Sequence, residues 1–234
     1  MDIHWSTPAA SPIPLNPGVV VFHEAFGVNP HILRVCDRLA GAGYVAAAPE
    51  LFHRSGHALQ FAYGDFASVR PVMAPLTNEQ LLMDARAAIE FLAKRPGVNR
   101  RQLVALGFCL GGFAAALAAC HLPLAAVVSF YGAGLTLRRP GLARRPLLDD
   151  FAGLGCPALF HFGESDPNIP PVEVAVLRER LQALGKPHEI VTYPNAGHGF
   201  FCEDRDSYNV TAAESAWTKS LAWFDSRLGP RAAG

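Results

Sequence analysis

The stretch from Leu103 to Gly112, LVALGFCLGG, constrains the fold of this chain more than any other. An apolar run ends in the pattern G-x-C-x-G, centred on Cys109, and an alanine-rich helical pattern follows at once. This arrangement is typical of a nucleophile elbow, a strained strand-to-helix turn in which a Cβ at either flanking glycine would clash. A buried structural cysteine at the end of a core strand is the alternative interpretation, and the rest of the chain decides between the two.

Apolar runs and helical patterns alternate along the sequence. The runs are short and apolar on both faces, as in parallel strands covered on both sides, and lie at residues 19–22, 44–48, 103–108, 126–131, 158–162 and 189–193. Helical periodicity occupies residues 31–41, 77–93, 110–119, 171–184 and 207–228. The pattern at 77–93 opens with a capping-box signature, in which Gln80 follows Thr77 by three residues.

This alternation predicts an α/β fold in a single domain over residues 1–234, with a mostly parallel central sheet and helices on both faces. Residues 52–76 are rich in glycine, proline and aromatic residues, and we expect them to form a loop or lid.

The charge balance excludes two classes of partner. Twenty basic residues match twenty acidic ones, so the chain has no basic field for nucleic acid or an anionic membrane. A small basic cluster, interrupted by two prolines, is interpreted as a solvated loop; it comprises Arg138, Arg139, Arg144 and Arg145.

The N-terminal segment has neither the basic nor the apolar part of a signal peptide, and the apolar stretches are too short to span a membrane. The five cysteines are scattered, without a C-x-x-C pair, so no disulfide framework is expected. These features predict a cytoplasmic protein in a reducing environment.

Polar residues follow several of the predicted strands. Glu24 comes shortly after the run at 19–22, Cys109 after 103–108, Asp166 after 158–162, and His198 after 189–193. Ligands of open parallel sheets bind at the carboxyl ends of the strands, so these residues are candidates for one site. The order of nucleophile, acid and histidine is that of the α/β-hydrolase triad.

Four motifs carry a family resemblance: HEAFGVN at 23–29, GFCLGG at 107–112, HFGESDP at 161–167 and AGHGF at 196–200. With them the chain resembles the dienelactone hydrolase family, a branch of the α/β hydrolases whose nucleophile is cysteine. The resemblance implies a hydrolase that cleaves a small-molecule carboxylic ester or lactone through a thioester acyl-enzyme, without a cofactor.

The resemblance also implies a role for individual residues. Cys109 corresponds to the nucleophile, His198 to the general base and acid, Asp166 to the residue that orients the imidazole, and Glu24 to a glutamate that keeps the thiol poised. A helix N-terminus and a nearby imidazolium would both favour the thiolate. The backbone N–H groups of Leu110 and Ala25 are the candidate oxyanion donors.

Several alternatives stay open. Glu24 is either catalytic or a buried structural carboxylate, and Glu164 competes with Asp166 for the role of the acid. His23, Glu24 and His198 could suggest a metal, but their spacing matches no known metal-binding motif, and no metal is expected. The chain could also be a non-catalytic relative that binds a small molecule or a partner, or a thiol-directed redox protein. The oligomeric state, monomer or small homo-oligomer, is left open.

The residues around the predicted site bear on the substrate. In the family an arginine shortly after the catalytic histidine holds the substrate carboxylate. Here the first arginine after His198 is Arg205, seven residues later, which is further than the family pattern places it. Arg70 and Arg54 are the other candidates for a carboxylate anchor. Aromatic residues are expected to line the pocket and to favour a less charged ester or lactone, namely Phe26, Tyr63, Tyr131, Phe200 and Phe201.

Overall fold

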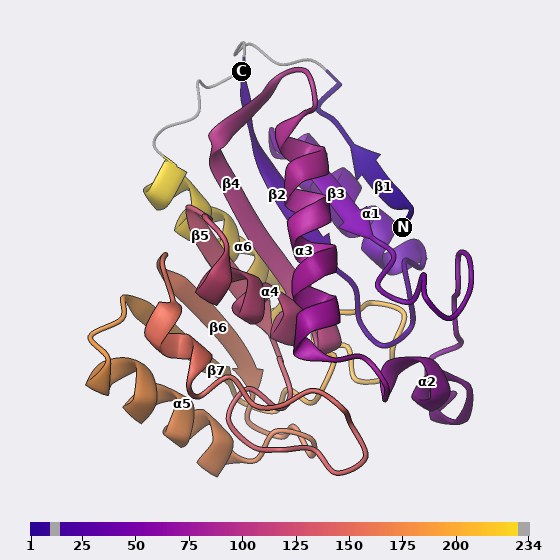
Figure 1. The fold of residues 1–234 in the computed structure, drawn as a ribbon. Coiled ribbons are helices and arrows are strands. Elements are labelled where there is room, and N and C mark those ends of the chain that lie inside the picture. Colours follow the sequence, from indigo (N-terminus) through magenta and orange to yellow (C-terminus); the bar gives the residue numbers. More distant parts are fainter. Residues whose placement is uncertain (10–14, 229–234) are drawn as a thin grey trace.

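The computed structural model describes residues 1–9 and 15–228 and is built around a seven-stranded sheet (Figure 1). Its strands are β1 (Ile3–Ser6), β2 (Asn16–Phe22), β3 (Val45–Pro49), β4 (Val98–Phe108), β5 (Ala126–Phe130), β6 (Ala158–Gly163) and β7 (His188–Tyr193). They lie in the order β1-β3-β2-β4-β5-β6-β7. Strands β2 to β7 are parallel, and β1 pairs antiparallel with β3. The predicted α/β class and mostly parallel sheet are confirmed.

Helices cover both faces of the sheet, as predicted. They are α1 (Pro30–Gly41), α2 (Phe66–Met73), α3 (Asn78–Ala93), α4 (Leu110–His121), α5 (Pro171–Ala183) and α6 (Val210–Leu228), with a 3₁₀ turn η1 (Asp150–Gly153). Helices α3 and α4 pack on one face, and α1 and α6 on the other (Figure 1). In the part of the chain that the structure describes, no helix is long and apolar enough to cross a membrane. Residues 10–14 and 229–234, which belong to the predicted domain and in part to the N-terminal segment, lie outside the described residues.

Local signals in the sequence set where helices begin. The Thr77 hydroxyl accepts a hydrogen bond from the Gln80 N–H at 3.2 Å, and the Gln80 side chain accepts one from the Thr77 N–H at 3.1 Å. The predicted capping box is therefore present at the start of α3. Helix α1 begins in a related way, with Asn29 as its N-cap and Pro30 in its first turn.

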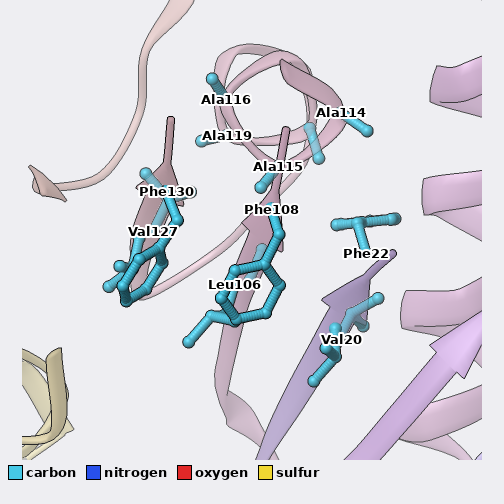
Figure 2. Close-up of a cluster of buried hydrophobic side chains, with 14 of the residues drawn as sticks. Val20, Phe22, Leu106, Phe108, Ala114, Ala115, Ala116, Ala119, Val127 and Phe130 are labelled. Carbon is cyan, nitrogen blue, oxygen red and sulfur yellow. The ribbon is translucent and has the colours of Figure 1, made fainter. Parts of the chain in front are cut away.

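Helix α4 lies deep in the molecule because its residues are small. Every residue from Leu110 to Cys120 is buried. Figure 2 shows four of its alanines, Ala114, Ala115, Ala116 and Ala119, beside the strands that carry Phe22, Phe108 and Phe130. Small side chains let the helix axis approach the sheet closely, and this fixes the position of the helix N-terminus that follows Cys109.

Besides the 3₁₀ turn η1, two elements were not predicted. Strand β1 is short and has two exposed residues, so its sequence lacks an apolar signal. Helix α2 lies within the segment predicted as a loop or lid, and that prediction is wrong for residues 66–73. Val69 is the one buried residue of α2, and Pro71 interrupts its pattern, so the sequence carries no apolar stripe there.

A glycine pair tests the close packing at the start of α4. A Cβ added at Gly111 would lie 2.0 Å from the Phe22 carbonyl oxygen, whereas one at Gly41, in α1, would meet nothing within 4 Å. Gly111→Ala is expected to lower the free energy of unfolding by about 1–3 kcal/mol or more, because two backbone segments must move apart. The matched control Gly41→Ala should leave it unchanged or slightly raised. Urea unfolding of both variants measures the difference, and equal stabilities would contradict the packing argument.

Candidate active site

Cys109 occupies a sharp turn between β4 and α4. Its backbone lies at φ 52° and ψ −113°, a conformation that side chains rarely adopt and that costs of the order of 1–3 kcal/mol. The turn is tight because a Cβ at Gly107 would lie 2.0 Å from the Gly111 carbonyl oxygen, and Gly111 itself lies against Phe22. The thiol is therefore held at the N-terminus of α4, where unpaired N–H groups favour an anion.

His198 and Asp166 meet at the same edge of the sheet. Asp166 follows β6 and His198 follows β7, and the His198 Nδ1–H donates to Asp166 Oδ2 at 2.7 Å. The second oxygen of Asp166 accepts a hydrogen bond from the Asn168 N–H at 2.7 Å, which fixes the carboxylate. The competing acid, Glu164, accepts instead from the Thr192 hydroxyl on β7. Since Nδ1 donates, the other ring nitrogen of His198 is left to face Cys109.

Two opposing effects act on the His198 imidazole. Burial favours the neutral ring, but the charge of Cys109 and the hydrogen bonds with Asp166 and Cys109 outweigh it and raise the pKa of His198 to about 10. At neutral pH the ring is thus an imidazolium beside the cysteine sulfur. The ring of Tyr131 packs edge-on against it, with centroids 5.1 Å apart.

The thiol and the imidazole open onto a cavity of about 420 Å³. Its walls are formed by Ala25, Phe26, Phe66, Arg70, Met73, Cys109, Ala133, Arg139, Pro140, Leu142, Arg144, Pro167, Asn168, His198 and Arg205. Of the residues predicted to bind substrate, Phe26 and Arg70 line this cavity. Tyr131 and Phe200 do not, and this part of the prediction is wrong. Both rings are fully buried and pack on each other behind His198.

Glu24 is buried at the end of β2, next to the cavity wall. Its Oε1 accepts a hydrogen bond from Arg205 at 3.2 Å, and its Oε2 has no hydrogen-bond partner among the described residues. His23 holds the adjoining backbone, since its Nδ1–H donates to the Glu24 carbonyl and its Nε2 accepts from the Leu51 N–H at 3.0 Å. Burial lowers the pKa of His23 to about 4, so its ring is neutral. Within residues 1–9 and 15–228, no three His, Cys, Asp or Glu side chains form a group that could hold a metal.

The cavity is more basic than the sequence analysis predicted. Arg70, Arg139, Arg144 and Arg205 all line it, and no acidic side chain does so among the described residues. The interpretation of the 138–145 cluster as a solvated loop is wrong for two of its four arginines. Arg144 is buried, and Arg139 is partly buried in an ion pair with Glu173.

Arg205 reaches the cavity although it lies far beyond His198 in sequence. The intervening loop is tied to α1 by Arg34, which contacts Glu203 and Asp204 at 2.6 Å. The loop then turns back toward the site and brings the guanidinium to Glu24. The other candidate anchor, Arg54, does not line the cavity and forms a bidentate ion pair with Asp84.

Comparison with known proteins agrees with this geometry. The model of the dienelactone hydrolase family matches residues 4–228. The chain belongs to this family. A "putative carboxymethylenebutenolidase" of Synechocystis sp. is 35% identical over 214 residues, which are 91% of this chain and 87% of the relative. A protein of the same description from Escherichia coli K12 is 36% identical over 229 residues, 96% of this chain and 82% of the relative.

Among solved structures, a "putative dienelactone hydrolase" from Klebsiella pneumoniae has a TM-score of 0.86 and 33% sequence identity, and the match covers 95% of this chain and 91% of that one. Membership of the dienelactone hydrolase family makes this protein a carboxylic-ester hydrolase, the enzyme class predicted from its motifs.

Arg139 and Arg144 are charged cavity residues that sequence reasoning missed in this dienelactone hydrolase family protein. A signal for them exists in the chain. They follow β5, and the carboxyl end of β5 lies beside those of β4 and β6, at the edge where the polar residues after other strands were sought. The arginines were assigned to solvent because of their charge and the neighbouring prolines, although their place after a central strand points to the site.

A titration tests the coupling between the sulfur and the imidazole. In Cys109→Ala the pKa of His198 is expected to fall clearly below its value of about 10, because a negative charge and a hydrogen bond are removed while burial remains. NMR detection of the His198 ring protons measures this shift. His161 serves as the internal control, since its pKa of about 3 is set by burial and should not change. A His198 pKa that stays near 10 would show that Cys109 does not contribute.

Proposed function

We propose that this protein cleaves a small-molecule carboxylic ester or lactone with Cys109 as the nucleophile. The observation that carries the proposal is the position of the thiol, held on a strained turn beside an imidazolium that is itself bonded to a buried carboxylate. Each feature is costly on its own, and together they suit an activated nucleophile. The family membership of the chain supports the same reaction class.

The first half of the reaction forms a thioester. The Cys109 sulfur attacks the carbonyl carbon, and the carbonyl oxygen becomes an oxyanion. The N–H of Leu110, unpaired within α4 as the first residue of the helix, and the N–H of Ala25 at the cavity wall are the proposed donors to that oxyanion. As the tetrahedral intermediate collapses, the carbon–oxygen single bond breaks and the His198 imidazolium gives its proton to the leaving alkoxide.

The second half releases the acid. The His198 ring, now neutral, takes a proton from a water molecule, which attacks the thioester carbonyl. The carbon–sulfur bond then breaks, so the thiolate and the imidazolium are restored. Asp166 keeps the ring in one tautomer and orientation through both halves. A lactone yields a hydroxy acid by these steps, and an open-chain ester yields an alcohol and an acid.

Replacement of the nucleophile tests the proposal. Cys109→Ala is expected to lower the turnover of p-nitrophenyl esters at least roughly a thousandfold. Mass spectrometry of the quenched wild-type enzyme should find an acyl group on Cys109. The matched control is Cys120→Ala, a buried cysteine at the far end of the same helix, which should retain turnover. Equal activity of the two variants would contradict the proposal and favour a non-catalytic or redox role.

Selective alkylation gives a second test. Burial raises the pKa of the Cys36, Cys120 and Cys156 thiols to about 12, so these groups are neutral and unreactive at pH 7. Iodoacetamide should therefore modify Cys109 first and abolish ester turnover in proportion. Mass spectrometry locates the label. Even labelling over several cysteines with retained activity would show that Cys109 is not the nucleophile.

Glu24 is proposed to keep the thiol poised, with Arg205 holding its carboxylate. Glu24→Gln preserves shape but removes the charge, so turnover should fall while the melting temperature stays close to that of the wild type. The pH profile of kcat/KM should shift as well, because a charge near the reacting groups is lost. A loss of stability with normal turnover per folded molecule would assign Glu24 a structural role instead.

A further inference from the structure

The turn that carries Asp166 lies at the surface. Asp166 itself is buried, but Pro167 and Asn168, which follow it, are exposed. The Asn168 N–H donates to Asp166 Oδ1 at 2.7 Å, so the orientation of the carboxylate depends on where Asn168 lies. An exposed turn lacks the apolar packing that holds residues of the core. Hydrogen bonds to the rest of the molecule therefore decide how firmly this carboxylate is held.

Arg139 provides one of these bonds. Its Nη2–H donates to the Asn168 carbonyl oxygen at 2.7 Å. Asn168 is thus bonded at both of its backbone groups, to Arg139 through its carbonyl and to Asp166 through its N–H. Asp166 in turn accepts a hydrogen bond from His198 at 2.7 Å. A continuous series of hydrogen bonds therefore leads from the guanidinium to the imidazole.

Glu173 holds the guanidinium in place. Its Oε2 accepts from the same nitrogen of Arg139 in an ion pair. Its Oε1 accepts from the N–H groups of Gly134 at 2.9 Å and Thr136 at 3.5 Å, and the Thr136 hydroxyl donates to the Glu173 carbonyl at 3.2 Å. Glu173 lies in the first turn of α5, so one residue joins this helix to the segment that carries Arg139.

The burial of this ion pair indicates what it contributes. The Glu173 side chain is 3% exposed and that of Arg139 is 27% exposed. The loss of hydration offsets most of the attraction in such a pair, so the pair adds little net stability. Its charge-assisted hydrogen bonds nevertheless have narrow geometric requirements, and they fix the guanidinium more closely than apolar contacts would. The pair is therefore better suited to setting a position than to stabilising the fold.

We propose that Arg139, fixed by Glu173, is a positioning residue that holds the Asp166 carboxylate toward His198 by way of Asn168. The inference rests on the proposed function, because it takes Asp166 as the acid that orients the imidazole. A displacement of about 1 Å in a site of this kind can cost roughly a hundredfold in rate, even when its cause lies away from the reacting atoms. Arg139 also lines the cavity, where direct contact with substrate is the competing explanation, and kinetics separate the two.

Hydrogen exchange measured by NMR tests the bond directly. In the wild type the Asn168 N–H should be protected from exchange although its residue is exposed. In Arg139→Met it should exchange at least roughly tenfold faster, and the pKa of His198 should fall below its value of about 10, because its hydrogen bond with Asp166 weakens. The matched control Arg138→Met, at an exposed neighbouring arginine, should keep both values. An unprotected Asn168 amide in the wild type overturns the proposal whether or not the variants fold, and so does a folded Arg139→Met in which neither value changes.

Kinetics distinguish positioning from direct substrate binding. For p-nitrophenyl acetate, kcat of Arg139→Met should fall roughly ten- to hundredfold while KM changes little, and Arg139→Lys, which keeps a charge beside Glu173, should lose less. If Arg139→Met leaves Glu173 unpaired and does not fold, the double variant Arg139→Met/Glu173→Gln, which removes both charges, should show the same loss of kcat. A rise in KM alone would make Arg139 a substrate-binding residue and overturn the proposal. Full turnover by Cys109→Ala would refute the nucleophile instead, and the His198 pKa would still decide the role of Arg139.

Discussion

The site depends on the contact between the start of α4 and the end of β2. Gly111 lies so close to the Phe22 carbonyl that no side chain fits between them, and Gly107 lies equally close to Gly111. This contact leaves Cys109, midway between the two glycines, only a strained backbone conformation. The packing of the alanine-rich helix α4 against the sheet compensates for this strain, because the helix is buried from Leu110 to Cys120. The strained backbone of Cys109 lowers the stability of the fold, and it holds the thiol at a helix N-terminus in the cavity wall.

The electrostatics of the site follow from the parallel sheet. Adjacent parallel strands end at one edge, so residues far apart in sequence meet there: Cys109 after β4, Asp166 after β6 and His198 after β7. Burial of the imidazole alone would keep it neutral, as it does for His161 within β6. Two neighbours, a sulfur and a carboxylate, are enough to reverse this effect for His198. Burial is common to both histidines, and the neighbouring charges decide that His161 is neutral and His198 is charged.

Much of this arrangement could be predicted from the sequence because it is encoded locally. Apolar runs identified the six parallel strands, and the capping box marked the start of α3. Helix α2 was missed because a short exposed helix with a single buried residue, Val69, leaves no periodic signal. The approach of Arg205 to Glu24 was missed for a different reason. It depends on contacts of Arg34 with a loop that lies about 170 residues further along the sequence. No local sequence pattern predicts such long-range contacts.

Arg144 illustrates how composition can mislead where topology would not. A charged residue between prolines is usually solvated, and the sequence was interpreted in that way. The residue is nevertheless buried, and its neighbours Ala143 and Arg145 donate backbone hydrogen bonds to Ala74 and Asn78, which hold the segment against the start of α3. The wall of the cavity therefore combines apolar side chains, among them Phe26, Phe66 and Met73, with four arginines.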